Sequence, residues 1–380
     1  MAKQKKGCYA MKIDFIPTIG FHKVTLRNFN ISIVDYDLLK SKAKVFHDSE
    51  ESDYCLTENC YVYNKIQIIN EDFVLKCYAY KTYASVVPVH HLTFSPDKTL
   101  ELFSIEALNK YIDRICDCLK TEYGLELDTT NIRFKAYEIA TQFVLDEPLT
   151  EYSRPFKILC NLNHNDKYRT MDLRKIEKDI RIWTSCLMKH NTHEMYVYDK
   201  TKQLKDVSSI YLDKNIVKIE LRIEDQNCLK NVFAYPLAEL TDEEVISYYK
   251  RKFNSIFKNP YLKWYKKYIE NLNTLIIEYR SKHTHWITEF LVYCADMEAK
   301  GIPILLDAAD ILECPCIKTD KKHFARTKKQ IENASKGYSI FNMNTQQKIK
   351  EIFLKVSDCM EHKASVIPIE VTGNICFFKY

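Results

Sequence analysis

The sequence predicts an α+β protein in which a mainly antiparallel sheet with helices is followed by a mostly helical C-terminal region. The first half of the chain is rich in short runs of β-branched and aromatic residues, which favour strands. From residue 241 onward, apolar residues recur at helical spacing instead. The 380 residues are enough for two domains. We expect them at 1–230 and 231–380, divided near 226–240, where Asn227 and Pro236 interrupt the pattern.

The N-terminal segment is expected to consist of strands. Residues 8–36 and 59–96 carry the β-branched and aromatic runs, and Pro17 and Gly20 mark a turn within the first of them.

Residues 104–123 predict a helix, because their apolar side chains recur three and four positions apart. Ser104 is a suitable N-cap and Gly124 a suitable C-terminal stop. A second helix is expected over 171–190.

The C-terminal region opens with Thr241 and Glu244, which have the spacing of a helical capping box. Further helices are expected near 261–280, 284–299 and 321–335.

Three segments alternate as half-buried strands do, over 133–145, 194–200 and 216–224. One face of each is apolar, and the other faces together carry Glu138, Gln142, Tyr198, Lys200, Lys218, Glu220 and Arg222.

Two carboxylates on neighbouring strands, Glu138 and Glu220, suit a hard cation such as Mg²⁺ or Mn²⁺. A tyrosine hydroxyl beside them is a candidate nucleophile, and lysine and arginine side chains could hold an oxyanion. The alternative is a solvated sheet face on which opposite charges pair across strands.

Composition excludes several classes of protein. The six glycines are too scattered for a GxGxxG or Walker loop, which argues against nucleotide binding through either. The fourteen cysteines include no CxxC pair, which disfavours structural zinc and a disulfide framework. The first residues do not resemble a signal peptide, and no apolar run approaches the roughly 20 residues that span a bilayer. We therefore expect a cytoplasmic protein with free thiols and no membrane partner.

The order of the three strands resembles a signature of rolling-circle replication initiators. The run YVYDKTKQLKD at 196–206 is followed by IVKIELRIED at 216–225, and AYEIATQF at 136–143 lies upstream. Phage replication proteins of the gene II/X type and the related staphylococcal plasmid initiators carry an aromatic-Asp/Asn-Lys motif, then Arg-hydrophobic-Glu, after an upstream acidic strand. The resemblance covers roughly residues 130–230.

Carried over residue by residue, the resemblance implies that Tyr198 is the catalytic tyrosine and Lys200 its adjacent lysine. It implies that Glu138 and Glu220 hold the metal. The chain departs from the family at four positions, which have Ala136, Gln142, Gln203 and Lys218 where the family has Arg, an acid, Glu and Arg.

The implied reaction is the nicking of one strand at a replication origin. Tyr198 would attack a phosphodiester and leave a 5′-phosphotyrosine and a 3′-OH primer, with Mg²⁺ or Mn²⁺ offsetting the developing charge. Lys200 would favour the phenolate or steady the phosphate. Tyr196, on the same face, is a second candidate nucleophile. The partners would be double- and single-stranded origin DNA, with the host helicase and polymerase.

The histidine pairs offer no clear metal site. His90 and His91 are adjacent and would point to opposite faces of a strand, and His283 and His285 fall at a helix start. We therefore expect an all-acid site or one with a single histidine.

Residues 249–268 combine seven basic residues with seven aromatic ones and no acid. Such a segment suits phosphate contacts and base stacking, and equally an amphipathic helix pair with buried aromatics. The predicted DNA contacts are Lys218, Arg222, Lys263, Lys266 and Lys267.

Two functions remain open. The first is a site-specific endonuclease and strand transferase that starts plasmid or phage replication. The second is a non-enzymatic DNA-binding protein of the same ancestry with a degraded metal site, which Ala136 and Gln142 keep open.

Overall fold

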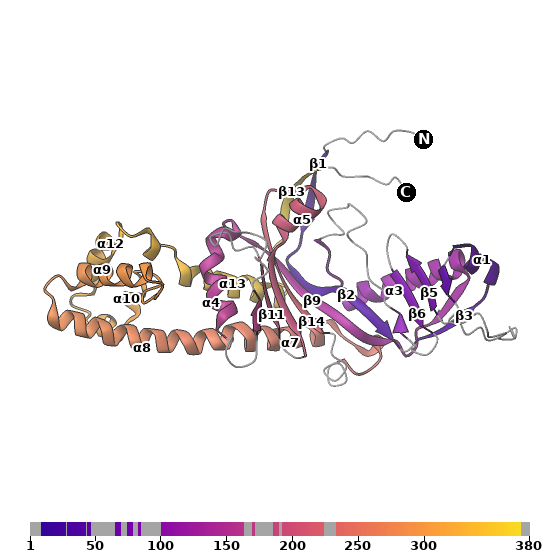
Figure 1. Ribbon diagram of the computed structural model, residues 1–380, viewed down its shortest axis with the longest axis horizontal. Helices are drawn as coiled ribbons and strands as arrows, with labels where there is room; N and C mark the ends of the chain where they lie inside the picture. The colour runs from indigo at the N-terminus through magenta and orange to yellow at the C-terminus, as the bar shows by residue number, and fades with distance from the viewer. Residues whose placement is uncertain are drawn as a thin grey trace.

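The computed structural model describes residues 9–27, 29–42, 44–46, 65–69, 74–78, 83–84, 100–162, 169–171, 185–189, 192–223 and 233–373. The molecule is elongated, with a helical lobe at one end, a large sheet at the centre and a smaller mixed region at the other end (Figure 1). The α+β class expected from the sequence is confirmed.

The central element is a seven-stranded antiparallel sheet in the order β10-β11-β12-β14-β9-β2-β7. Its members are β2 (Thr18–Arg27), β7 (Tyr83–Ala84), β9 (Arg133–Leu145), β10 (Arg169–Met171), β11 (Ser185–Lys189), β12 (Glu194–Asp199) and β14 (Asn215–Ile223). The three strands predicted from alternation, β9, β12 and β14, are therefore neighbours in one sheet, as the prediction required.

Smaller sheets flank the large one. A three-stranded sheet brings the first and last described strands together, and is made of β1 (Tyr9–Phe15), β15 (Ile367–Gly373) and β13 (Ile210–Leu212). The opposite end holds two more sheets and a helix, formed by β3 (Asn30–Ile33), α1 (Tyr36–Lys42), β4 (Lys44–Phe46), β5 (Lys65–Ile69), β6 (Val74–Tyr78) and β8 (Leu125–Asp128).

Local signals set several helix ends. Helix α3 (Ile105–Tyr123) begins where the Ser104 side chain accepts the Ala107 N–H, and ends at Gly124, whose φ of 63° is left-handed. Helix α7 (Asp242–Phe253) begins with the predicted capping box between Thr241 and Glu244.

Three expectations about elements are wrong. Gly20 lies inside β2 rather than in a turn, and a Cβ there would sit 2.6 Å from the Phe103 carbonyl oxygen. Lys200 begins helix α5 (Lys200–Ser208) instead of ending a strand. Of the helix expected over 171–190, residues 172–184 lie outside the described part, and β11 occupies the end of that range.

Helices cover the apolar face of the central sheet. Helix α7 continues through a π-helical turn (Asn254–Lys258) into α8 (Asn259–Lys282), and α13 (Thr345–Met360) packs on the same core with α4 (Ser153–Asn161). Tyr249 of α7 donates to the Ile219 carbonyl of β14 at 3.0 Å. The helices that follow residue 240 are thus part of the sheet's own core.

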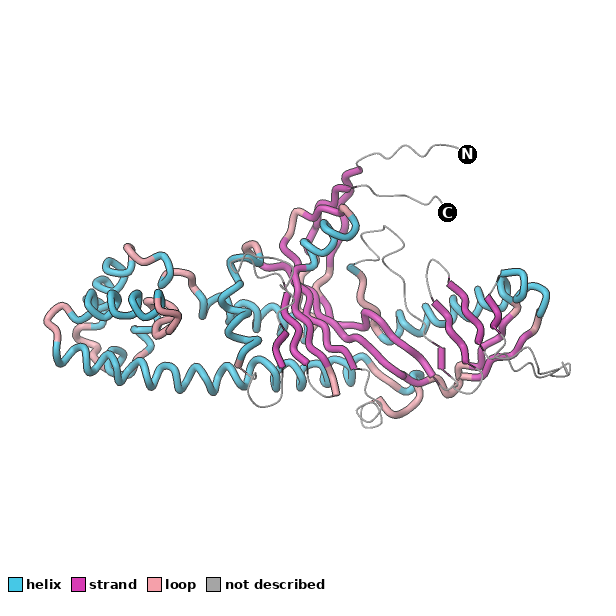
Figure 2. Tube along the Cα trace, in the orientation of Figure 1, coloured by secondary structure: helices cyan, strands magenta, loops and turns pink. Residues whose placement is uncertain are grey.

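The helical lobe has a separate core, centred on α9 (Trp286–Ala299) and the outer part of α8. It also holds α10 (Asp310–Glu313), α11 (Pro315–Lys318) and α12 (Phe324–Ser335) (Figure 2). The expected boundary near 226–240 therefore does not separate the cores, because the chain returns from this lobe to the core of the central sheet through α13. Among the described helices, none has both the length and the apolar composition needed to cross a bilayer.

Candidate active site

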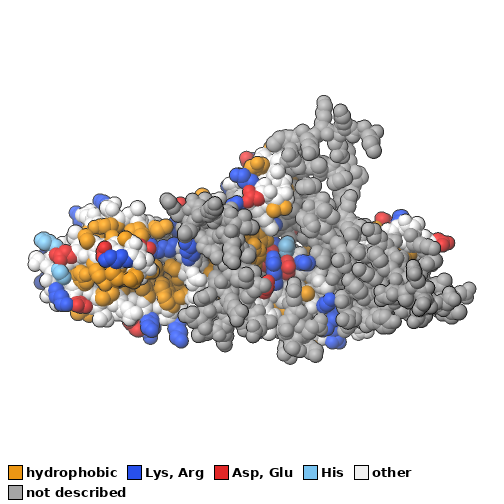
Figure 3. Space-filling model, in the orientation of Figure 1, with side chains coloured by type: hydrophobic (Ala, Val, Ile, Leu, Met, Phe, Trp, Pro, Cys, Tyr) orange, Lys and Arg blue, Asp and Glu red, His pale blue; other side chains and the backbone are white. Residues whose placement is uncertain are grey.

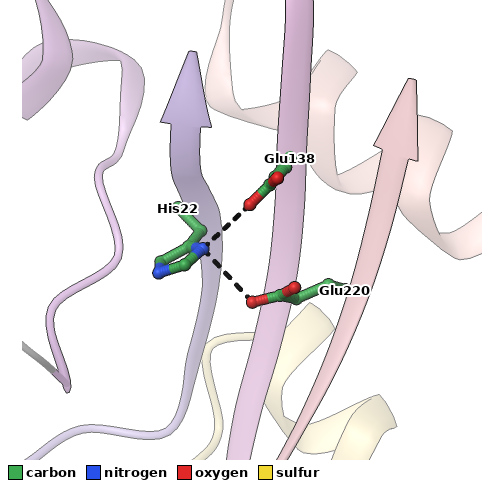
Figure 4. A group of neighbouring side chains, drawn as sticks. All are labelled: His22, Glu138 and Glu220. Atoms are coloured by element: carbon green, nitrogen blue, oxygen red, sulfur yellow. Dashed lines mark hydrogen bonds and ion pairs between the residues drawn. The ribbon is translucent and has the colours of Figure 1, made fainter. Parts of the chain in front are cut away.

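The polar face of the central sheet brings three metal-ligating side chains together from three adjacent strands. Glu138 lies on β9, Glu220 on β14 and His22 on β2 (Figure 4). The β2–β9 register shifts between residues 21 and 23, so His22 is the extra residue of a bulge. The bulge places its ring beside both carboxylates.

The distances within this group suit a divalent ion. His22 Nδ1 lies 3.1 Å from Glu138 Oε2 and 3.2 Å from Glu220 Oε1. Ligands about 2.1 Å from a metal and at right angles to each other would be separated by roughly 3.0 Å. Among the described residues, these three form the one group of histidine, cysteine or acidic side chains whose ligand atoms gather within 4.8 Å. An imidazole with two carboxylates is a donor set that Mn²⁺ or Mg²⁺ accepts.

The protonation of the first two ligands also fits metal binding. Burial, and then the charge of Lys218, lowers the pKa of His22, so its imidazole is neutral at neutral pH and offers a ring lone pair. Burial acts to raise the pKa of Glu138, but its hydrogen bond with His22 and the charge of Arg222 leave that pKa below its usual value.

Glu220 is the centre of the group, and its side chain is fully buried. Tyr198 donates its hydroxyl to Glu220 Oε1 at 2.8 Å, and Lys218 Nζ lies 3.0 Å from the same oxygen. Arg222 donates to Oε2 at 2.7 Å. Burial opposes ionisation, yet the charges of Lys218 and Arg222 and the hydrogen bond from Arg222 hold the pKa of Glu220 well below its usual range. The carboxylate is therefore ionised and satisfied on both oxygens.

Lys218 is placed differently from the prediction. Its side chain is 0% exposed, and the residue opposite it on β9, Gln142, is also buried and donates to the Leu100 carbonyl at 3.1 Å. A phosphate on the protein surface cannot reach this ammonium, so its assignment as a DNA contact is wrong. Burial lowers the pKa of Lys218, and Glu220 is its counter-charge.

Arg222 remains accessible. Its side chain is 32% exposed, and it reaches Glu138 at 3.6 Å as well as Glu220. Its guanidinium lies 4.9 Å from the centre of the Tyr196 ring, a cation–π contact. The predicted DNA contact at Arg222 is therefore sterically open.

Lys200 lies at the site, but it belongs to a helix rather than to the predicted strand. Asp199 caps α5 by accepting the Lys202 N–H at 2.8 Å, and Lys200 is the first residue of that helix. Lys200 Nζ donates to Gln203 Oε1 at 3.1 Å and is largely buried. Burial, followed by the charge of Lys218, lowers the pKa of Lys200 to about 7.

The rings of Tyr196 and Tyr198 lie side by side, tilted by 32°, with centroids 4.8 Å apart. Tyr198 is only 5% exposed. Burial and the neighbouring Glu220 carboxylate raise the pKa of Tyr198 well above its ordinary value. The expected depression of this pKa by Lys200 is therefore wrong for this arrangement. Tyr196 is half-buried.

Figure 3 shows basic, acidic and histidine side chains gathered over the central strands on the face in view. The face opposite to Glu220 is the one that α7 covers, since Ile219 alternates with Glu220 along β14. Lys263, Lys266 and Lys267, which lie on the helix that continues α7, are therefore not brought to the candidate active site.

The segment 249–268 adopts the amphipathic arrangement left open from the sequence. Its first four aromatic residues are buried in the sheet core, and the other three are partly buried, so base stacking is not supported. Lys263, Lys266 and Lys267 are exposed, and none forms an ion pair with another residue in the described part of the chain. Their contact with DNA phosphates stays a prediction.

Sequence reasoning missed His22. It considered only histidine pairs, of which His90 and His91 lie outside the described residues. His283 pairs with Glu289 on the surface and joins no cluster of metal-ligating side chains within the described ranges. The signal that could have pointed to His22 was a lone histidine within residues 8–36, a segment expected to consist of strands.

No protein-family model matches the chain, and no curated protein sequence matches it. The resemblance to rolling-circle initiators therefore rests on the quoted motifs alone and stays a prediction.

Proposed function

We propose that this chain is a metal-dependent, site-specific DNA endonuclease and strand transferase that initiates rolling-circle replication of a plasmid or phage. One observation carries the proposal: a tyrosine hydroxyl lies 2.8 Å from a carboxylate that belongs to a His22, Glu138 and Glu220 group. A nucleophile beside a candidate metal site is an arrangement that suits tyrosine attack on a phosphodiester.

His22, Glu138 and Glu220 would hold Mg²⁺ or Mn²⁺, which supplies Lewis-acid stabilisation of a phosphate oxygen. Tyr198 Oη attacks phosphorus and the bond from phosphorus to the 3′ oxygen breaks. The proton lost by the Tyr198 hydroxyl is balanced by the proton taken up at the 3′ oxygen, so the products are a 5′-phosphotyrosine and a 3′-OH. Lys200, whose Nζ donates to Gln203, lies beside this group and supplies positive charge near the phosphate when it is protonated.

Arg222 is the cation of the site that DNA can reach. Its guanidinium is partly exposed beside Tyr196 and both carboxylates, so it can donate paired hydrogen bonds to a phosphate. The buried Lys218 ammonium has a supporting role, because its charge keeps Glu220 ionised.

A specific observation favours the second function. Glu220 already has donors on both oxygens, and the raised pKa of Tyr198 disfavours the phenolate. Such a closed network is also what a degraded site would retain as internal support. The alternative is a non-enzymatic DNA-binding protein of the same ancestry.

Nicking of supercoiled DNA separates the two. The substrate is a plasmid that carries the DNA flanking the coding region, incubated with the purified chain and Mn²⁺, Mg²⁺ or EDTA. We expect nicked circles only with metal, and none from His22→Ala or Glu138→Ala, although both should still bind duplex DNA. His283→Ala, a surface histidine far from the site in the sequence and the fold, is the matched control and should nick normally.

Wild-type protein that binds this DNA but never nicks it would support the non-enzymatic alternative. Undiminished nicking by both site variants would remove the metal assignment.

A further inference from the structure

We propose that the outward face of α12 reads the base sequence of duplex DNA, separately from the candidate active site. This inference rests on the proposed function, because a site-specific nicking enzyme has to find its origin within duplex DNA. It assigns that task to a surface that the active-site chemistry does not use.

Helix α12 has two clearly different faces. Its inward face packs on the core of the helical lobe through Ile331, with Phe324 and Ala334 beside it. Its outward face carries exposed side chains spaced three, four and three residues apart, namely Arg326, Lys329, Asn333 and, just after the last turn, Lys336. Residues at these spacings share one side of a helix.

The four outward side chains are basic or polar, and Glu332 is the one acid of α12. Arg326 and Lys329 form no ion pair with any residue in the described ranges, and the nearest pair, Lys328 with Glu332 at 3.9 Å, lies on the flank. Lys321 and Lys322 are also exposed, just before the helix begins. Basic side chains are seen over α12 at the upper edge of the lobe (Figure 3).

The residue types distinguish this face from a general phosphate contact. Arginine pairs in a bidentate manner with guanine and asparagine with adenine in the major groove, whereas lysines mainly meet phosphates. The 12 residues of α12 make a rod about 18 Å long, which a groove about 12 Å wide admits. Helix α8 also exposes Lys263, Lys266 and Lys267, a lysine group that suits phosphate contacts.

The lobe is tied to the sheet, so α12 stands at a set position relative to the candidate active site. Arg154 of α4 donates to the carbonyls of Ile340 at 3.1 Å and Leu305 at 3.3 Å. The unbroken α8 runs from the sheet core into the lobe (Figure 1). A recognition surface held in this way would place the nick at a set distance from the sequence it reads.

The test is a selection from 40-base-pair duplexes with a randomised centre, performed in EDTA so that neither metal nor nicking takes part. We expect the wild-type chain to enrich one sequence family. Arg326→Ala combined with Asn333→Ala should lower affinity for the enriched duplex roughly 10-fold or more, while affinity for a shuffled duplex changes less than about 3-fold.

Lys282→Ala combined with Lys300→Ala is the matched control in the same lobe, because both lysines are exposed and paired with neighbouring acids. It should keep the wild-type preference, and circular dichroism should show that both double variants remain folded.

Three results overturn the inference: no sequence is enriched by wild type, the α12 variant keeps the wild-type preference, or it loses affinity equally for both duplexes. The last result would reduce α12 to a phosphate contact. Enrichment without nicking of any substrate that carries the enriched sequence would refute the proposed function and leave the role of α12 standing.

Discussion

Replacing Glu220 with glutamine tests the buried network directly. The change keeps the shape of the side chain and removes its charge. Lys218, whose side chain is 0% exposed, then loses the carboxylate that lies 3.0 Å away. Arg222 suffers less, because its side chain is 32% exposed and reaches water.

The expected cost follows from these exposures. Removing one partner of a buried ion pair typically costs about 3–5 kcal/mol, since the other charge is left unpaired. The whole free energy of unfolding of a natural protein is about 5–15 kcal/mol. Glu220→Gln should therefore destabilise the protein by about 3–5 kcal/mol. Adding Lys218→Met removes the unpaired ammonium, so the double variant should recover about 2 kcal/mol of that loss.

Urea unfolding followed by circular dichroism measures this, with the slope reported beside the midpoint to test two-state behaviour. Glu370→Gln is the control, because its pair with Lys12 at 3.3 Å joins side chains that are 62% and 76% exposed. Such a surface pair should contribute less than about 1 kcal/mol.

A free energy of unfolding for Glu220→Gln within about 1 kcal/mol of the wild-type value would refute this expectation. The expectation also fails if the double variant is destabilised by the sum of the two single changes, because independent contributions would mean that the two charges do not interact.

Three further predictions concern other parts of the molecule. Tyr198→Phe should form no covalent adduct with labelled single-stranded origin DNA in the presence of Mn²⁺. It should also be about 1.5–3 kcal/mol less stable, because it loses a hydrogen bond to a charged group. Tyr196→Phe should keep the adduct, and the reverse pattern would identify Tyr196 as the nucleophile. Replacing the three exposed lysines of α8, Lys263, Lys266 and Lys267, with alanine should weaken DNA binding at every sequence. The plot of log K against log salt should become shallower by roughly one unit for each phosphate that a lysine no longer neutralises, whereas an unchanged slope would show that these lysines do not touch DNA. Burial, and then the charge of Asp307, raises the pKa of Asp310 from 3.8 to about 6, so the folded state holds this proton more tightly than the unfolded state. The free energy of unfolding should therefore fall by up to about 3 kcal/mol as pH rises from 4 to 6. Asp310→Asn should abolish this part of the pH dependence in thermal unfolding, and a profile identical to that of wild type would contradict the assignment.

The sequence by itself determined what depends on near neighbours. The caps of α3 at Ser104 and Gly124 and the capping box at Thr241 are contacts between residues a few positions apart, so they could be read directly. Alternation along β9, β12 and β14 likewise assigned Glu138 and Glu220 to one polar face, because side chains of a strand alternate whatever it pairs with.

The alternating pattern of a strand does not show which segments cover each of its faces. It marked the polar face of β14 but not the burial of Lys218 and Glu220, which comes from segments distant in sequence. The aromatic residues that follow Tyr249 could have faced DNA or the sheet, and only the packing of α7 against β14 directs them inward.

The tertiary structure alone decided the composition of the candidate metal site. His22 and Glu138 are 116 residues apart, and a bulge in β2 brings the imidazole to the carboxylates. Lys200 lies in a helix rather than in the expected strand because Asp199 caps α5, and the alternating pattern did not indicate this cap. Periodicity records which way a side chain points from its own backbone, whereas a site is made where separate strands meet, and strand pairing is a property of the whole fold.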